Sequence, residues 1–410
     1  MVPIAPQFND TDANRLFRLL IGVFFIGGFL TSVVSLVVPR LKLVLDLDYT
    51  QALLVQLAFH VSYLLFAVPI TITVVGVGYM RAIAAGLAVM MAGCLAFVTA
   101  DFARDFALIL AALLLLSAGI TVLQIAANTV VTIVGAAASA AARLTLLQGF
   151  NSLGTVVGPL IAAPLLLAKP VGTAQPVATI LPFVLSATVL AFLSLMFFRH
   201  RALLPQAAAS RTNGHLLEQL PGVWRDRRLR AGTAAMFAYV GAEVTIGTLL
   251  TNFLMQSGVL GLAPVPAGRL VSLYWGGAML GRFAGAALLG RVAPALLLTL
   301  SASGAASLTF IAIAMQGPAA AAALLAVGLC NAVMYPTIYA LALPAQADAA
   351  PLGSMLLCMA VVGGAVIPVA TGVAADAVGL GAALTLPALC YTGIIAFAWS
   401  CRSAAPTRTV

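Results

Sequence analysis

Residues 119–135 read GITVLQIAANTVVTIVG, and this stretch is apolar enough to lie in a lipid bilayer except at Gln124 and Asn128. The whole chain shares this character, because 63% of its 410 residues are hydrophobic and only 8% are charged. A water-soluble protein of this length needs more charged residues to cover its surface. Backbone groups in hydrocarbon must be paired within each segment, so the membrane spans are helices. The composition therefore predicts an all-α integral membrane protein.

Twelve apolar runs can be drawn along the chain, each near the length of about 20 residues that a helix needs to cross the hydrocarbon core. Short connections join them except for the polar segment 199–230, which contains RTNGHLLEQLPGVWRDRRLR. We therefore expect an N-terminal six-helix bundle over 1–198, a cytoplasmic linker over 199–230 and a C-terminal six-helix bundle over 231–410. Weak similarity between the halves predicts two pseudo-symmetric bundles with a site between them near the midplane.

The distribution of basic residues predicts the orientation of the chain. With the N-terminus in the cytoplasm, 14 of the 20 arginine and lysine residues lie inside and five lie outside, while Arg282 falls within a span. This bias predicts that both termini are cytoplasmic. It also accounts for the net charge of +9, so no nucleic-acid partner is expected.

Glu243, in the segment FAYVGAEVTIGTLLTNFL, is the one acid of the chain that falls well inside a predicted span. Ionisable side chains in hydrocarbon are costly, and they usually face the bundle interior and serve function. Tyr239 lies four residues earlier and therefore on the same face of the helix. We expect Glu243 to carry a proton or to bind a hydroxylated ligand. The alternative is a structural acid that bonds the backbone or a neighbouring helix.

Polar side chains in rows on several other predicted spans suggest a shared cavity. Amide and phenol groups suit a sugar, because its hydroxyls need donors and acceptors and a pyranose has an apolar face for aromatic stacking. The alternative for each single residue is a structural hydrogen bond to a neighbouring membrane helix. Glu243 and His60 are the candidate proton-coupling residues, although a packing role fits His60 equally well. The candidate substrate-binding residues are Gln124, Asn128, Gln148, Asn151, Tyr239, Glu243, Asn331, Tyr335, Gln56, Tyr274 and Trp275.

Other chemistries find little support in the sequence. The segment GRFAGAALLGR has glycines, but no strand precedes it and it has no phosphate-loop lysine. The chain shows no Walker motif, no metal-ligand cluster and no Ser-His-Asp arrangement. We therefore expect no cofactor, no metal and no enzymatic activity, and transport that is driven by a gradient or runs passively.

GITVLQIAANTVVTIVG followed by RLTLLQGFNSLGT resembles the span 4–5 signature of the fucose/glucose–galactose permease branch of the major facilitator superfamily. YVGAEVTIGTLLTNFL is similar to its span 7, and GRFAGAALLGRVAP and MYPTIYALAL are similar to its spans 8 and 10. The resemblance runs from about residue 15 to residue 400. It implies the twelve-helix fold of that superfamily and sugar uptake coupled to protons.

The chain departs from the fucose symporter pattern at several positions. That pattern has an Asn-Asp pair before a proline in span 1, where this chain has Val34 and Ser35. It has a glutamate at the position of Gln124, whereas the glucose–galactose relatives are similar to this chain in having glutamine. Thr129 replaces the proline of the family's AANP. The span 1 carboxylate is thus missing, so that either Glu243 carries the coupling, or the protein is a facilitator, or its substrate differs.

The residues and the resemblance together predict a transporter in the bacterial inner membrane, and the resemblance implies a monomer. We expect it to move a hexose or a related small sugar by alternating access, with protons and membrane lipid as further partners. An uncoupled sugar facilitator and an exporter of a drug, metabolite or sugar derivative remain alternatives. A membrane-embedded enzyme would need a catalytic cluster, and the sequence shows none. A sugar sensor usually has a long signalling extension, whereas the linker over 199–230 is short.

Overall fold

The computed structural model describes residues 10–45, 49–134, 137–166, 175–204, 217–346 and 348–403, and within them it contains helices and no strand. Ten helices in these ranges are long and apolar enough to cross a membrane. Two further helices, α2 (Tyr49–Val77) and α9 (Pro264–Leu288), have 29 and 25 residues. At a rise of 1.5 Å per residue each of them exceeds the hydrocarbon core of about 30 Å. The predicted all-α membrane fold is confirmed.

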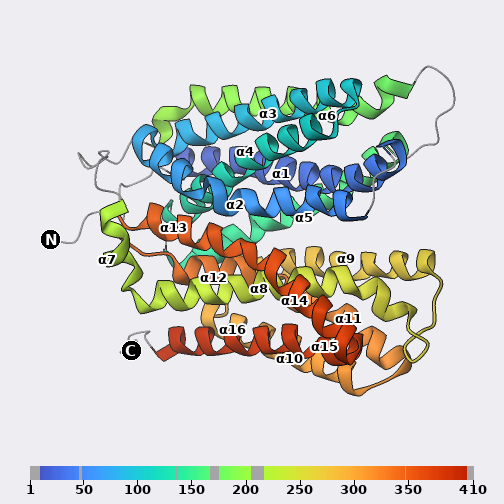
Figure 1. Cartoon of the computed structure of the whole chain (residues 1–410). Helices are drawn as coiled ribbons and strands as arrows, with labels where there is room; N and C mark the ends of the chain where they lie inside the picture. Colours follow the sequence, from blue (N-terminus) through green and yellow to red (C-terminus); the bar gives the residue numbers. More distant parts are fainter. Residues whose placement is uncertain are drawn as a thin grey trace. The chain divides into compact units, whose positions relative to one another are not determined.

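The first of two compact units comprises residues 1–140, 150–220 and 345–358. Within it α3 packs against both α4 and α6, and α2 also packs against α4 (Figure 1). Asp105 begins α4 by accepting hydrogen bonds from the backbone nitrogens of Ala107 and Leu108. The further helices of this unit are α1 (Asp10–Leu45), α3 (Tyr79–Ala103), α4 (Phe106–Ile133), α5 (Ala140–Leu166), α6 (Gln175–Arg199), the short η2 (Arg201–Leu203) and α13 (Ala350–Met359).

Glycines bring α1 and α5 into direct backbone contact. A Cβ atom on Gly28 would overlap the carbonyl oxygen of Asn151, and one on Gly154 would overlap the carbonyl oxygen of Phe25. Small residues allow this close approach, which replaces the hydrophobic effect as a source of helix association inside a membrane. The two helices are thereby fixed against each other over about one turn.

The second compact unit comprises residues 141–149, 221–344 and 359–410. Its central element is α8 (Arg227–Met255), which packs against α9, α12, α14 and α16. The other helices of this unit are α7 (Leu220–Trp224), α10 (Pro294–Ala314), α11 (Gly317–Asn331), α12 (Met334–Ala342), η4 (Ala360–Val362), α14 (Gly363–Val378), α15 (Leu380–Ala383) and α16 (Thr385–Ser403). The short η3 (Leu217–Gln219) belongs to the first unit. The predicted bundle boundaries at 198 and 230 stay a prediction.

The span over 317–342 consists of two helices, because α11 ends at Asn331 and α12 begins at Met334. Pro336 has no backbone N–H, and its ring would clash with the carbonyl group of Ala332 in a continuous helix. The proline therefore accounts for the break. The break places Asn331 at a helix end, where its backbone carbonyl has no helical partner within α11.

Candidate functional site

An ion pair between α8 and α9 forms the charged centre of the second unit. The Glu243 Oε1 atom lies 3.6 Å from the Arg282 Nη2 atom, and each side chain is 14% exposed. A lone charge in a membrane interior is expensive, and pairing two opposite charges reduces that expense. Both side chains are therefore largely buried, but neither is fully enclosed.

Two tyrosines fix the backbone and the side chain of Glu243. The Tyr274 hydroxyl donates to the backbone oxygen of Glu243 at 3.1 Å. The Tyr239 hydroxyl donates to the backbone oxygen of Asn331 at 3.2 Å and lies close to the Glu243 carboxyl group. A phenol has a single proton to donate, so the Tyr239 hydroxyl serves one of these two acceptors at a time.

Asn331 is the hub that joins these tyrosines. Its Nδ2 atom donates to the Tyr274 hydroxyl at 2.8 Å, and its Oδ1 atom accepts from the Tyr391 hydroxyl at 2.9 Å. Asn331, Tyr274 and Tyr391 are each 0% exposed. The network therefore connects α8, α9, α16 and the end of α11 through satisfied buried groups, an arrangement that makes a polar core rigid. This geometry gives Asn331 a positioning role, and direct binding of substrate by its amide stays a prediction.

Trp275 presents an accessible aromatic face beside the ion pair. Its side chain is 40% exposed, and its ring packs edge-on against Tyr274 with centroids 5.0 Å apart. Its Cζ2 atom would lie 2.7 Å from a Cβ atom on Gly247, which is one helical turn beyond Glu243 on the same face of α8. The glycine thus allows the indole to rest against α8 next to the carboxylate.

Two further tyrosines extend this aromatic surface along α12. The Tyr335 ring centroid lies 6.4 Å from that of Tyr239 and 6.3 Å from that of Tyr339. Tyr335 is half-buried, whereas Tyr339 is buried. The structure therefore brings together Tyr239, Glu243, Tyr274, Trp275, Asn331 and Tyr335, six of the predicted site residues, in the second unit.

The predicted residues of the first unit form two separate sets of contacts. On α4 the Asn128 Nδ2 atom donates to the Gln124 Oε1 atom at 2.7 Å, so the two amides noticed in the sequence bond each other. On α5 the Asn151 Nδ2 atom donates to the backbone oxygen of Phe24 at 3.0 Å and so joins α5 to α1. The structure thus adds a helix-joining role to Asn151.

Three predicted residues remain, namely Gln148, Gln56 and His60. Gln148 is 8% exposed on α5 and belongs to the short segment 141–149 that groups with the second unit. Gln56 and His60 fall on α2, but their side chains lie outside the described residues. Their predicted roles stay predictions.

Arg282 and Tyr391 belong to this constellation but were not among the residues predicted from the sequence. Arg282 carried a usable signal, because it is the one arginine that falls well inside a predicted span and Glu243 is the one acid that does so. Two opposite charges that are each costly in hydrocarbon are expected to pair. Tyr391 carried no comparable signal, since a phenol in an apolar helix is an ordinary packing residue.

Comparisons with known proteins agree with the helical fold. The family model described as Major Facilitator Superfamily matches residues 19–368. A glucose/galactose transporter from Brucella abortus is 39% identical over 341 residues, which cover 81% of this chain and 82% of the relative. The L-fucose-proton symporter of Escherichia coli is 28% identical over 362 residues, which cover 80% and 81%. The crystal structure of the E. coli fucose:proton symporter matches with a TM-score of 0.84 and 25% identity over 94% of this chain and 98% of that one.

Proposed function

Since this chain belongs to the major facilitator superfamily, we propose that it moves a hexose or a related small sugar across the membrane by alternating access, in symport with protons. The glucose/galactose transporter and the L-fucose-proton symporter among its relatives support both the sugar and the proton. The excess of arginine in the segments assigned to the cytoplasmic side supports an inner-membrane location with both termini in the cytoplasm.

The Glu243–Arg282 pair is the observation that carries the proposal of proton coupling. Arg282 on α9 and Tyr239 on α8 are the polar groups that contact the Glu243 carboxylate. A proton that binds Glu243 neutralises the carboxylate and removes its attraction for Arg282. The carboxylic acid and the guanidinium group are then both able to bond the hydroxyls of a neutral sugar. Proton binding and sugar binding thereby favour each other at one site, as symport requires.

Trp275 supplies the apolar part of the proposed sugar site. Its exposed indole face offers a stacking surface for a pyranose ring within one helical turn of the ion pair. Gln148 and Tyr335 are proposed as further contacts, and sugar binding by Gln124 and Asn128 stays a prediction. Asn331 is proposed to act through Tyr274, which holds the backbone of Glu243.

Transport in proteoliposomes tests this function. The wild type is expected to accumulate labelled glucose, galactose or another hexose when the outside is more acidic, and about tenfold accumulation per pH unit is the limit for one proton per sugar. Glu243→Gln keeps the size and hydrogen-bonding capacity of the side chain but cannot exchange a proton. We expect it to lose accumulation and to retain exchange of labelled for unlabelled sugar.

Glu218→Gln is the matched control, because Glu218 is an exposed acid on η3 that lies outside the predicted spans. We expect this variant to accumulate sugar like the wild type. Accumulation that survives Glu243→Gln would show that another group carries the proton. A wild type that only equilibrates hexose would establish the facilitator instead, and a failure to move any hexose in the panel would reject sugar transport.

A further inference from the structure

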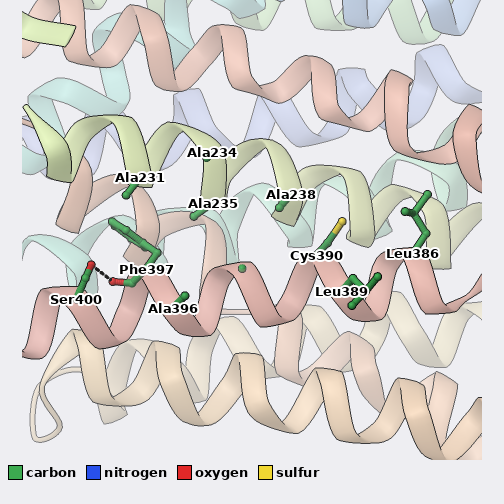
Figure 2. Close-up of a pocket in the computed structure, with 11 residues that line it drawn as sticks. Ala231, Ala234, Ala235, Ala238, Leu386, Leu389, Cys390, Ala396, Phe397 and Ser400 are labelled. Atoms are coloured by element: carbon green, nitrogen blue, oxygen red, sulfur yellow. Dashed lines mark hydrogen bonds between the residues drawn. The ribbon is translucent and has the colours of Figure 1, made fainter. Parts of the chain in front are cut away.

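A groove of about 600 Å³ runs between α8 and α16 in the second unit (Figure 2). Alanines form its α8 side, among them Ala231, Ala234 and Ala238, while its α16 side includes Leu389 and Gly393. A Cβ atom on Gly393 would meet no atom within 4 Å, so the groove is open at its α16 side. Leu389 is 59% exposed, which places an apolar surface on the outside of a membrane protein, where lipid is the surrounding solvent.

The groove offers nothing that a sugar could bind. Ser400 is the one lining residue with a hydroxyl group, and its Oγ atom donates to the backbone oxygen of Phe397 at 2.7 Å (Figure 2). The other lining side chains are apolar apart from a cysteine thiol. A sugar would lose its hydrogen bonds to water here without replacement, whereas an acyl chain would lose none.

One end of the groove is strongly basic. Arg227 and Arg228 precede Ala231 by four and three residues, so they continue the line of alanines along the same face of α8. Both arginines are exposed, and Arg228 lies close to the thiol of Cys401, next to Ser400 on α16. The adjacent acid, Asp226, is engaged in capping the start of α8 through the backbone nitrogens of Arg228 and Leu229.

Aromatic residues mark the same end as a membrane–water interface. Trp399 is 61% exposed, and the Arg402 guanidinium carbon lies 5.1 Å from the centroid of its ring. Trp224, just before α8, is 42% exposed. Tryptophan and arginine together are typical of the headgroup level of a bilayer, where an indole has one apolar and one wet side.

The groove is long enough to span one leaflet. From Leu386 to Ser400 its α16 side is about 21 Å long at 1.5 Å per residue, and one leaflet is about half of the hydrocarbon core of about 30 Å. A chain that enters the groove near Leu389 therefore brings its headgroup to Ser400 and Arg228. We propose that the groove binds one acyl chain of an anionic phospholipid, whose phosphate group is held by Arg228 and Arg227.

This lipid site would support the helix that carries Glu243. Tyr239, four residues before Glu243 on α8, is fully buried, whereas Ala234 and Ala238 line the groove, so α8 is held by protein on one face and by lipid on the other. The proposal does not depend on the identity of the transported sugar.

Native mass spectrometry of the full chain tests the site. The protein in detergent is offered phosphatidylglycerol and phosphatidylcholine at equal concentrations, and we expect it to retain phosphatidylglycerol. Arg228→Gln is expected to weaken this binding about fivefold, since an arginine near an anionic headgroup contributes about 1 kcal/mol. Gly393→Leu fills the open side of the groove and is expected to remove the bound lipid, while size-exclusion chromatography checks that the variant stays folded.

Two substitutions in the same unit serve as matched controls. Gly372→Leu adds the same side chain on α14 at a glycine whose Cβ would also meet no atom within 4 Å, and Arg291→Gln removes an exposed arginine after α9. Both are expected to retain phosphatidylglycerol like the wild type. Equal retention of the two lipids, equal loss in the controls, or a dimer that Gly393→Leu dissociates would each overturn the proposal.

Discussion

Replacing Arg282 with leucine is expected to abolish sugar accumulation and to destabilise the second unit. The substitution leaves the Glu243 carboxylate, 3.6 Å from the lost guanidinium group and only 14% exposed, without its counter-charge. Removing one partner of a buried ion pair typically costs about 3–5 kcal/mol. Thermal unfolding in detergent should show a clear decrease in transition temperature, and proteoliposomes should show neither accumulation nor exchange.

The double variant Glu243→Gln with Arg282→Leu separates the two effects. It removes both charges, so it should recover most of the lost stability while it remains unable to couple sugar to protons. Arg282→Lys keeps the charge but loses the planar fork, and an intermediate transport rate is expected. An Arg282→Leu variant as stable and as active as the wild type would show that the ion pair has no role in folding or transport.

Asn331→Leu is expected to have the second largest effect, through the hydrogen-bond network. The substitution keeps the size of the side chain but makes it apolar. It removes the acceptor of the Tyr391 hydroxyl and the donor to the Tyr274 hydroxyl. A buried polar group left without a partner costs about 1–3 kcal/mol. Since Tyr274 holds the backbone of Glu243, we expect weaker sugar binding as well as a lower transition temperature.

Tyr391→Phe, alone and combined with Asn331→Leu, completes a double-mutant cycle. The combined variant has no orphaned Tyr391 hydroxyl, so its destabilisation should be smaller than the sum of the two single effects. Accumulation driven by a pH gradient should persist at high sugar concentration, because Glu243 and Arg282 remain. Strict additivity of the two substitutions would refute the network as a coupled unit.

The fold was predictable because it depends on averages over many residues. The chain is 63% hydrophobic, and backbone groups in hydrocarbon must be paired, so membrane-spanning helices are expected. The motif around Gln124 and Asn128 indicates the family. The break between α11 and α12 was not anticipated, although Pro336 marks it. A proline in a membrane span is tolerated often enough that its presence alone predicts no break.

The geometry of the site was predictable only where its residues share one helix. The four-residue spacing of Tyr239 and Glu243 places them on one face of α8, and the structure places the Tyr239 hydroxyl close to the Glu243 carboxyl group. The distance between Glu243 and Arg282 depends on how α8 is rotated against α9. The periodicity of a single helix does not predict this rotation. The buried contacts of Asn331 with Tyr274 and Tyr391 could not be predicted for the same reason. They give Asn331 a positioning role, and its predicted role as a sugar ligand stays a prediction.

Sugar-evoked proton movement measures the central claim most directly. When hexose is added outside proteoliposomes that hold no gradient, the wild type should take up protons with the sugar and make the weakly buffered medium more alkaline. Glu243→Gln should leave the pH of the medium unchanged while it still exchanges labelled sugar. An alkaline shift of wild-type size in Glu243→Gln, or sugar entry into wild-type vesicles without any shift, would contradict the account.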